Sequence, residues 1–187
     1  MQDIVLSEED VWKGGFFRVK RQRIRSAQGK YFFRELVSRS DGVAIVPVTN
    51  DGQVLMIQEY AAGAAKPLLF IPGGMTEATS ESRRQQEAQR ELREEIGMRA
   101  NRLVKLWQTF EAPAMLDRKV HIYLGLDLVV DPLNSPDIDE EIVVKRMSFD
   151  EAIVKASAPD GSAAAVLGAL FLAREYLRNH PPVDSRS

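Results

Sequence analysis

The residues best suited to chemistry lie in a short acidic run, Arg90-Glu91-Leu92-Arg93-Glu94-Glu95-Ile96-Gly97-Met98. With 3.6 residues per turn, an α-helix places Glu91 and Glu95 one turn apart, with Glu94 beside them. Like charges at this spacing oppose helix formation by about 0.2–0.5 kcal/mol per pair. Hard carboxylate oxygens suit Mg²⁺ or Mn²⁺, and Mg²⁺ commonly links one or two carboxylates to substrate phosphates. The run therefore indicates a divalent metal site, with a solvated helix face joined by ion pairs as the alternative.

A glycine-rich stretch, Ile71-Pro72-Gly73-Gly74, precedes the acidic run and is expected to form a loop. Because glycine has no side chain, the backbone here can come close to a ligand and turn a carbonyl toward a metal. Ser80 is a residue type that caps the start of helices, and Gly97 is a type that ends them. These signals predict a helix over about 80–96, beside the glycine loop.

Together, these two features resemble the Nudix box of hydrolases that act on nucleoside diphosphates linked to another moiety X. The box reads Gly, five residues, Glu, seven residues, then Arg-Glu-hydrophobic-x-Glu-Glu-x-Gly-hydrophobic, and its second half matches from Arg90 to Met98. The first half departs, because Ser82 holds the glutamate position and Thr76 holds the glycine position. If Gly74 is the box glycine, the loop carries two extra residues.

The resemblance implies a metal cofactor, Mg²⁺ with Mn²⁺ as a substitute. Glu91, Glu94 and Glu95 would be its side-chain ligands, and the Gly73 carbonyl would be a fourth. Glu94 and Glu95 are accordingly expected to be essential to catalysis as well as to metal binding. The reaction would be attack of water on a diphosphate.

Four further residues are expected to order the loop. Arg90 is expected to hold the loop rather than touch the substrate, and Gly74 is the expected box glycine. In the family, the box glutamate pairs with the box arginine. Glu81, one position away, or Glu87, about one turn before Arg90, is expected to replace it.

The general base is expected outside the helix. In the ADP-ribose branch of the family, a loop glutamate after the long strands is often assigned this role, and the matching segment is 137–143. Glu140 is the first choice and Glu141 the second. The alternative is that this segment is only a solvated acidic loop.

Outside the box, most of the chain resembles the ADP-ribose and ADP-sugar branch. In that branch, an N-terminal hairpin helps to form a homodimer and completes the nucleotide site. Gln58-Glu59-Tyr60 and Glu111-Ala112-Pro113-Ala114 resemble two further segments of the branch. Phe17, Arg34 and Tyr60 are candidate nucleotide contacts, with a place in the core or at the rim as the alternative.

The substrate implied by the resemblance is ADP-ribose or a related ADP-sugar, NADH or dinucleoside polyphosphate, with AMP as a product. A GDP-sugar such as GDP-mannose stays open, because nothing in the sequence distinguishes adenine from guanine. A catalytically weakened nucleotide-sensing domain is the alternative from another class. The altered first half of the box favours a sensor, whereas the intact Glu91, Glu94 and Glu95 argue for an enzyme.

The predicted fold is α+β, a Nudix-type α/β/α sandwich around a mixed sheet with an N-terminal antiparallel β-hairpin. Residues 1–40 are expected to form the hairpin subdomain that dimerises, 41–180 the Nudix hydrolase domain, and 181–187 a loose tail. An apolar stripe, Ala88, Leu92 and Ile96, should dock the box helix on the sheet. Strands are predicted at 16–25, 31–37, 43–48, 53–58, 68–71, 103–110 and 119–130, and further helices at 149–157 and 163–179. The turn Thr49-Asn50-Asp51-Gly52 is predicted to join strands 43–48 and 53–58 as a hairpin. The last helix is predicted to have one apolar face, made of Val166, Leu167, Leu170, Phe171 and Leu177.

Bulk composition excludes several other classes of protein. The chain has 187 residues, 28% of them charged, with a formal net charge of −2, so broad electrostatic binding to nucleic acid is not expected. It has no cysteine, which excludes disulfides and thiol nucleophiles, and its two histidines, His121 and His180, form no triad pattern. No signal peptide or membrane span is visible, so the cytoplasm is the expected location and no membrane partner is expected.

Overall fold

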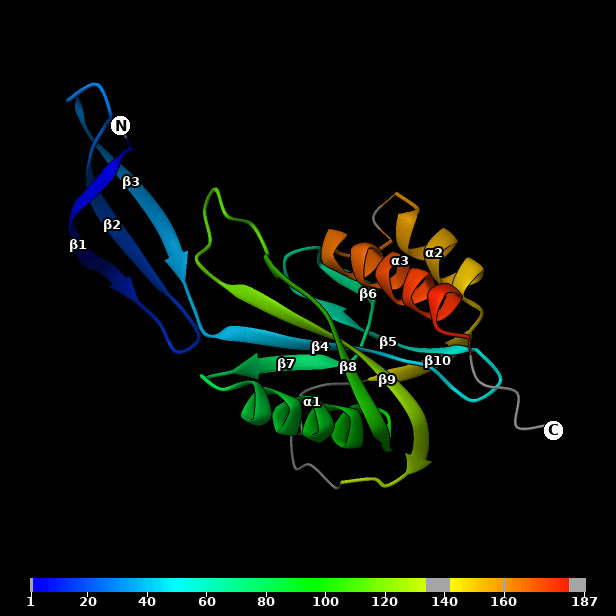
Figure 1. Cartoon of the computed structure of the whole chain (residues 1–187). Coiled ribbons are helices and arrows are strands. Elements are labelled where there is room, and N and C mark those ends of the chain that lie inside the picture. Colours follow the sequence, from blue (N-terminus) through cyan, green and yellow to red (C-terminus); the bar gives the residue numbers. More distant parts are fainter. Residues whose placement is uncertain (1, 134–141, 160, 182–187) are drawn as a thin grey trace. The chain divides into compact units, whose positions relative to one another are not determined.

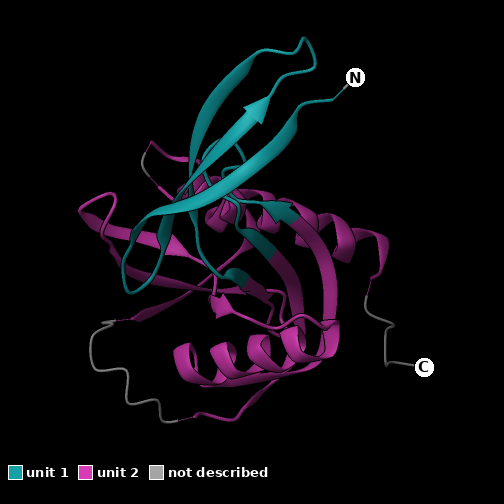
Figure 2. Ribbon diagram, turned by 90° about the vertical axis from the view of Figure 1, so that its left-hand side faces the viewer, with its two compact units in different colours: residues 1–42, 109–120 teal, residues 43–108, 121–187 magenta. Residues whose placement is uncertain are grey.

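The computed structural model describes residues 2–133, 142–159 and 161–181 in two compact units. Unit 1 comprises residues 1–42 and 109–120, and unit 2 comprises 43–108 and 121–187 (Figure 2). Figure 1 labels the elements along the chain. They are β1 (Ile4–Lys13), β2 (Arg18–Arg25), β3 (Tyr31–Ser38), β4 (Asp41–Pro47), β5 (Val54–Ala61), β6 (Lys66–Phe70), β7 (Gly73–Thr76), α1 (Glu81–Glu95), β8 (Met98–Phe110), β9 (Lys119–Val130), β10 (Val143–Met147), α2 (Phe149–Ser157) and α3 (Ala164–Asn179).

Unit 1 contains a three-stranded antiparallel sheet in the order β1-β2-β3. Strands β2 and β3 form the predicted hairpin around a turn in which Gly29 adopts a φ of 82°. The sequence did not predict β1, which pairs with β2 along its whole length. Two register shifts interrupt that pairing, between Val5 and Ser7 and between Asp10 and Trp12. Such bulges break the two-residue alternation from which a strand is predicted.

Unit 2 has the predicted layered arrangement. Its strands belong to a four-stranded sheet in the order β7-β4-β9-β8 and a three-stranded sheet in the order β10-β5-β6. Helix α1 lies on one side of these strands, and α2 and α3 lie on the other (Figure 1). None of the described helices combines the length and the apolar content that crossing a bilayer requires. The core beneath α1 consists of Val43, Ile45, Ala88, Leu92, Ala100 and Tyr123, with Ile96, Leu103 and Leu128 packed against it.

Two local predictions around β4 need correction. The turn at 49–52 is present, with the Gly52 N–H donating to the Thr49 carbonyl at 2.8 Å, but β4 and β5 enter different sheets. A bridge joins Val48, the residue after β4, to Val54, the first residue of β5. The glycine stretch is also less of a loop than predicted, because Gly73–Thr76 forms the short strand β7 beside β4. Turn chemistry fixes a reversal of the chain, whereas tertiary packing decides which strands then pair.

The second half of the chain largely follows the prediction. Ser148 caps α2 by accepting a hydrogen bond from the Glu151 N–H at 3.2 Å. Helix α3 buries Val166 and Leu170 as expected, but Phe171, predicted on the same apolar face, is 41% exposed. Strand β10 was not predicted, and its residues are exposed up to Met147.

Candidate functional site

Helix α1 positions the acidic run, and its local sequence explains both ends. The Ser80 side chain accepts a hydrogen bond from the Arg83 N–H at 3.3 Å, which caps the first turn. Ala88 and Leu92 are fully buried against the sheet. The helix ends at Glu95, and Gly97 then adopts a φ of 68°, which glycine tolerates without strain. Both predicted ends are correct to within one residue.

Arg90 lies at the centre of the acidic run and binds three carboxylates. Its Nε donates to Glu87 Oε2 at 3.0 Å, its Nη1 to Glu94 Oε2 at 2.5 Å, and its Nη2 to Glu91 Oε1 at 2.5 Å. Burial by itself would lower the pKa of Arg90, but the hydrogen bond to Glu87 and the charges of Glu91 and Glu94 outweigh burial and raise the pKa. One guanidinium thus compensates the like-charge repulsion within the run.

The first strand residues after Pro72 lie directly against this cluster. The Gly73 N–H donates to Glu95 Oε2 at 3.0 Å. A Cβ at Gly73 would collide with the Val43 carbonyl, and a Cβ at Gly74 would collide with the Glu91 carboxylate. Glycine is therefore required at Gly73, where the obstacle is backbone, whereas a side chain at Gly74 would displace the Glu91 carboxylate.

The chemistry of the donors fits a hard divalent cation. Glu91, Glu94 and Glu95 supply carboxylate oxygens, which Mg²⁺ and Mn²⁺ prefer, and each carboxylate can accept more than the one bond described above. Within the described residues, however, no three Asp, Glu or His side chains are gathered closely enough to hold a metal. Arg90 and the Gly73 N–H hold the three carboxylates instead. Their role as metal ligands therefore stays a prediction.

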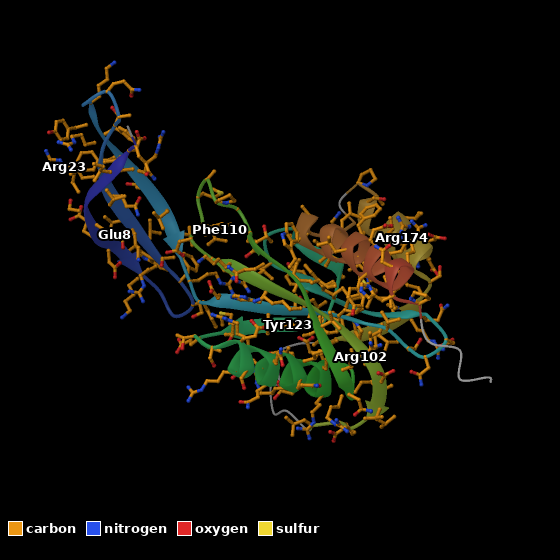
Figure 3. All side chains as sticks on the ribbon, in the orientation of Figure 1. Glu8, Arg23, Arg102, Phe110, Tyr123 and Arg174 are labelled. Carbon is orange, nitrogen blue, oxygen red and sulfur yellow. The ribbon has the colours of Figure 1, made fainter. Side chains whose placement is uncertain are left out.

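The two proposed substitutes for the missing box glutamate make different contacts. Glu87 binds Arg90, as the family's glutamate would. Glu81 instead accepts hydrogen bonds from the Lys105 Nζ at 2.7 Å and from the Tyr123 hydroxyl at 2.8 Å. Tyr123 points from β9 toward the first turn of α1 (Figure 3), and its burial raises the pKa of its hydroxyl. This contact ties the start of α1 to the sheet.

The other end of α1 is held by contacts between Arg93 and Asp131, which were not predicted from the sequence. The Arg93 Nε donates to the Asp131 carbonyl at 3.2 Å and forms an ion pair with the Asp131 carboxylate at 3.3 Å. The Asp131 N–H donates to the Gly97 carbonyl, and the Leu133 N–H donates to the Arg93 carbonyl. The end of β9 therefore satisfies carbonyls at the end of α1. In the sequence, the feature that could have indicated this contact is Arg93, a basic residue inside the acidic run.

The remaining predicted site residues lie outside α1 and β7. Tyr60 lies in β5 of unit 2, opposite Pro67, and is 66% exposed. Arg34 and Phe17 belong to unit 1, where the Arg34 guanidinium lies over the Phe32 ring and the Phe17 ring lies 5.0 Å from the Trp12 ring. Their role as nucleotide contacts stays a prediction. The proposed bases, Glu140 and Glu141, lie outside the described residues.

Comparisons with known proteins agree with this geometry. The family model of the NUDIX domain matches residues 38–167. The ADP-ribose pyrophosphatase of Bacillus subtilis (strain 168) is 26% identical over 154 residues, covering 82% of each chain. The ADP compounds hydrolase NudE of Escherichia coli (strain K12) is 28% identical over 176 residues, covering 93% of this chain and 92% of that one.

A solved structure described as an ADP compounds hydrolase superposes with a TM-score of 0.85 at 28% identity, covering 98% of both chains. The likeness thus extends over both units and includes the box helix. Because the family model covers more than half of the chain and the fold agrees throughout, this protein belongs to the Nudix family and is a Nudix hydrolase.

Proposed function

We propose that this hydrolase cleaves the diphosphate bond of an ADP-linked compound and releases AMP. The proposed substrates are ADP-ribose or a related ADP-sugar, NADH or a dinucleoside polyphosphate. The observation that carries the proposal is the set of three carboxylates on α1, placed against the Gly73–Gly74 backbone of a Nudix fold. The relatives named for ADP-ribose and for ADP compounds support adenine as the base.

In this proposal, Glu91, Glu94 and Glu95 hold the metal together with the Gly73 carbonyl. A bound Mg²⁺, or Mn²⁺ in its place, would neutralise the diphosphate and lower the pKa of a coordinated water. Arg90 keeps the carboxylates close together against their mutual repulsion, through its bonds to Glu91 and Glu94. The Gly73 N–H orients Glu95 through a hydrogen bond to its carboxylate.

Glu140 is the proposed general base, with Glu141 as the second choice. General base catalysis typically supplies 10²–10⁴-fold in rate, so Glu140→Gln should lower turnover by at least about 100-fold. Metal affinity, measured by calorimetry, should be unchanged. A loss of less than about tenfold would move the assignment to Glu141 or away from this segment.

We also propose that two copies of the chain associate through the sheet of unit 1. Strand β1 is exposed at every position, and only Ile24 is buried in the three strands of this sheet. Light scattering at micromolar concentration should give the mass of a dimer; a monomer would refute the association. The large exposed apolar residues here are Ile4, Val5, Leu6, Val11, Trp12, Phe16, Phe17, Tyr31 and Phe33.

Product analysis tests the proposed reaction directly. Purified protein with Mg²⁺ should be offered ADP-ribose, ADP-glucose, NADH, diadenosine polyphosphates and GDP-mannose in parallel, and the products separated by chromatography. Release of AMP supports the proposal and identifies the substrate. Release of GMP alone would replace it with the GDP-sugar alternative. Absence of cleavage with both Mg²⁺ and Mn²⁺, together with nucleotide binding, would support the sensing domain.

A further inference from the structure

We propose that Arg93 and Asp131 are positioning residues for the carboxylates at the end of α1. The contact between them holds the last turn of the helix, and it acts through Glu94 and Glu95 rather than on the substrate. The proposal rests on the proposed function, because it takes these two glutamates as metal ligands. It adds a requirement that lies outside the box helix, at the residue that follows β9.

The end of α1 is the part of the helix that most needs support from other residues. Glu91, Glu94 and Glu95 all lie within its last five residues. The C-terminus of a helix carries partial negative charge, so carboxylates are unfavourable there. Arg90 offsets the repulsion among the carboxylates, but the last four carbonyls of a helix still lack partners within it. This end should therefore fray unless other residues hold it.

The segment after β9 supplies backbone contacts to this end. The Leu133 N–H donates to the Arg93 carbonyl at 3.1 Å, and the Asp131 N–H donates to the Gly97 carbonyl at 3.0 Å. Pro132 has no N–H, so this short stretch uses every N–H that it has. The Arg93 Nε also donates to the Asp131 carbonyl at 3.2 Å. The two segments are therefore joined both before and after the last two carboxylates of α1.

An ion pair adds side-chain contacts at the same place. The Arg93 Nη2 donates to Asp131 Oδ1 at 3.3 Å, and the Arg93 Nε lies 3.3 Å from Asp131 Oδ2. The side chains are 33% and 38% exposed, so water screens the pair only in part. The Arg99 Nε, from β8, also lies 3.3 Å from Asp131 Oδ2. Asp131 thus joins the end of α1 to β8, and a cation near this end of a helix is favourable in itself.

Support of the helix end matters because functional groups must stay within about 0.5 Å of their productive geometry. In the metal-free chain, a frayed last turn would have to form again before the carboxylates could bind an ion together. Apparent affinity falls in proportion to the fraction of molecules that are competent to bind. Loss of the contact should therefore raise the metal concentration needed for half-maximal activity, and leave turnover at saturating metal nearly unchanged.

Arg93→Gln separates positioning from simple electrostatics, because the two predict changes of opposite sign. Removing a positive charge beside an acidic run should by itself tighten the binding of a divalent cation. Loss of positioning should instead weaken binding by about tenfold, the lower end of the range for residues that support a metal ligand. Binding of Mn²⁺ to the full chain, followed by electron paramagnetic resonance of the free ion, measures this without substrate. Arg93→Lys, which keeps the charge but not the planar fork, should restore part of the affinity.

Arg102, labelled in Figure 3, provides the matched control. Its Nε forms an ion pair with Asp127 Oδ2 at 3.4 Å, and this pair joins β8 to β9 without involving α1. Arg102→Gln should leave the Mn²⁺ affinity unchanged or slightly tighter. Asp131→Ala should weaken it. The double variant of Arg93→Gln with Asp131→Ala should lose little more than the larger single loss, because both residues act through one contact.

Hydrogen exchange of the metal-free chain tests the support of the helix end without any metal. Amides in the last turn of α1 should exchange faster in Arg93→Gln than in wild type, whereas those near the buried Ala88 should not. Mass spectrometry of peptides covering the helix measures both. Unchanged exchange in the last turn would overturn the proposal, because the contact would then not hold the helix end.

Mn²⁺ affinity in Arg93→Gln equal to or tighter than that of wild type would also overturn it, as would an equal loss in Arg102→Gln. Glu95→Gln then shows what has failed. If Glu95→Gln weakens Mn²⁺ binding, the carboxylates are ligands and only the positioning role is wrong; if it does not, the proposed metal site is wrong as well. If Arg93→Gln does not fold, Arg93→Lys and Asp131→Ala decide the question by the same measurement.

Discussion

The β1-β2-β3 sheet of unit 1 and the β7-β4-β9-β8 sheet of unit 2 differ in what holds them together. In unit 1, the β1-β2-β3 sheet buries only Ile24, and ion pairs join its strands, such as Lys20 with Glu8 at 2.7 Å and Arg21 with Glu35 at 2.7 Å. In unit 2, β9 is buried throughout Val120–Leu126 and lies in the middle of its sheet. Exposed ion pairs contribute little, whereas burial of apolar side chains is the main stabilising term in folding.

The two units differ in how far buried packing fixes the positions of their residues. The carboxylates of α1 stand on a helix whose opposite face is buried, so the sheet beneath fixes their positions. Three strands without a hydrophobic face covered by another layer are marginally stable. The sheet of unit 1 therefore needs a covering partner, which is why we propose a second copy of the chain there.

The largest effect is expected on catalysis from a change in unit 2. Glu95→Gln removes a proposed metal ligand while keeping a group that can accept from the Gly73 N–H. Because changes to residues that only support a ligand typically cost 10–100-fold, turnover should fall by more than about 100-fold. Steady-state kinetics with ADP-ribose checks this. The control Glu175→Gln on α3 should retain full activity, and a Glu95→Gln enzyme with near-normal turnover would remove this residue from the metal site.

Stability should respond very differently to truncation in the two units. Leu92→Ala empties space in the fully buried core under α1 and should cost about 2–5 kcal/mol in the free energy of unfolding. Val11→Ala in β1, where Val11 is 41% exposed, should cost less than about 1 kcal/mol in the monomer. Urea unfolding of the two variants measures the difference. Equal losses would contradict the view that unit 1 has little core of its own.

Arg90 should act as the cation of the site when no metal is bound. Arg90→Gln leaves Glu91 and Glu94 without their guanidinium partner, so the metal-free variant should unfold at a lower temperature than wild type. Added Mg²⁺ should then raise the melting temperature more in Arg90→Gln than in wild type, because ligand binding stabilises the folded state by mass action. Differential scanning calorimetry with and without Mg²⁺ is the measurement. A smaller rise in the variant would contradict the proposed compensation.

The smallest effects should come from acid. Burial raises the pKa of Glu81, but the hydrogen bonds from Lys105 and Tyr123 outweigh burial and lower the pKa below 4.5. In unit 1, the hydrogen bonds from Gln22 and Lys20 lower the pKa of Glu8 below the same value. A lowered pKa stabilises the fold above the unfolded value, and that contribution is lost as pH falls through the folded pKa.

Urea unfolding between pH 6 and about 3 should therefore show a loss of stability below about pH 4.5. Glu81→Gln and Glu8→Gln should each make the decrease in the free energy of unfolding at low pH slightly smaller. The effect should be small because both carboxyls are more than a third exposed and solvent screens their charges. If only Glu8→Gln reduces the pH dependence of the free energy of unfolding, the contact between Glu81 and Tyr123 contributes nothing to stability.

Much of the site followed from the sequence. The Ser80 cap, the stripe of Ala88 and Leu92 and the stop at Gly97 are local features, so they specify α1 and the face that carries its carboxylates. Strand β1 could not be predicted, because two register shifts interrupt its alternation. The contacts of Glu81 could not be predicted, because they depend on Tyr123 and Lys105, which lie more than twenty residues further along the chain.

By itself, the sequence determined the family resemblance, the helix that carries the acidic run and the residue types that could hold a metal. These depend on spacing within one or two turns, where the backbone geometry is known in advance. Tertiary structure alone decided that the Gly73 N–H donates to Glu95, that β4 and β5 separate into two sheets, and that Arg93 pairs with Asp131. Such contacts join residues that are distant in sequence or select one rotamer among several, and local spacing does not specify either.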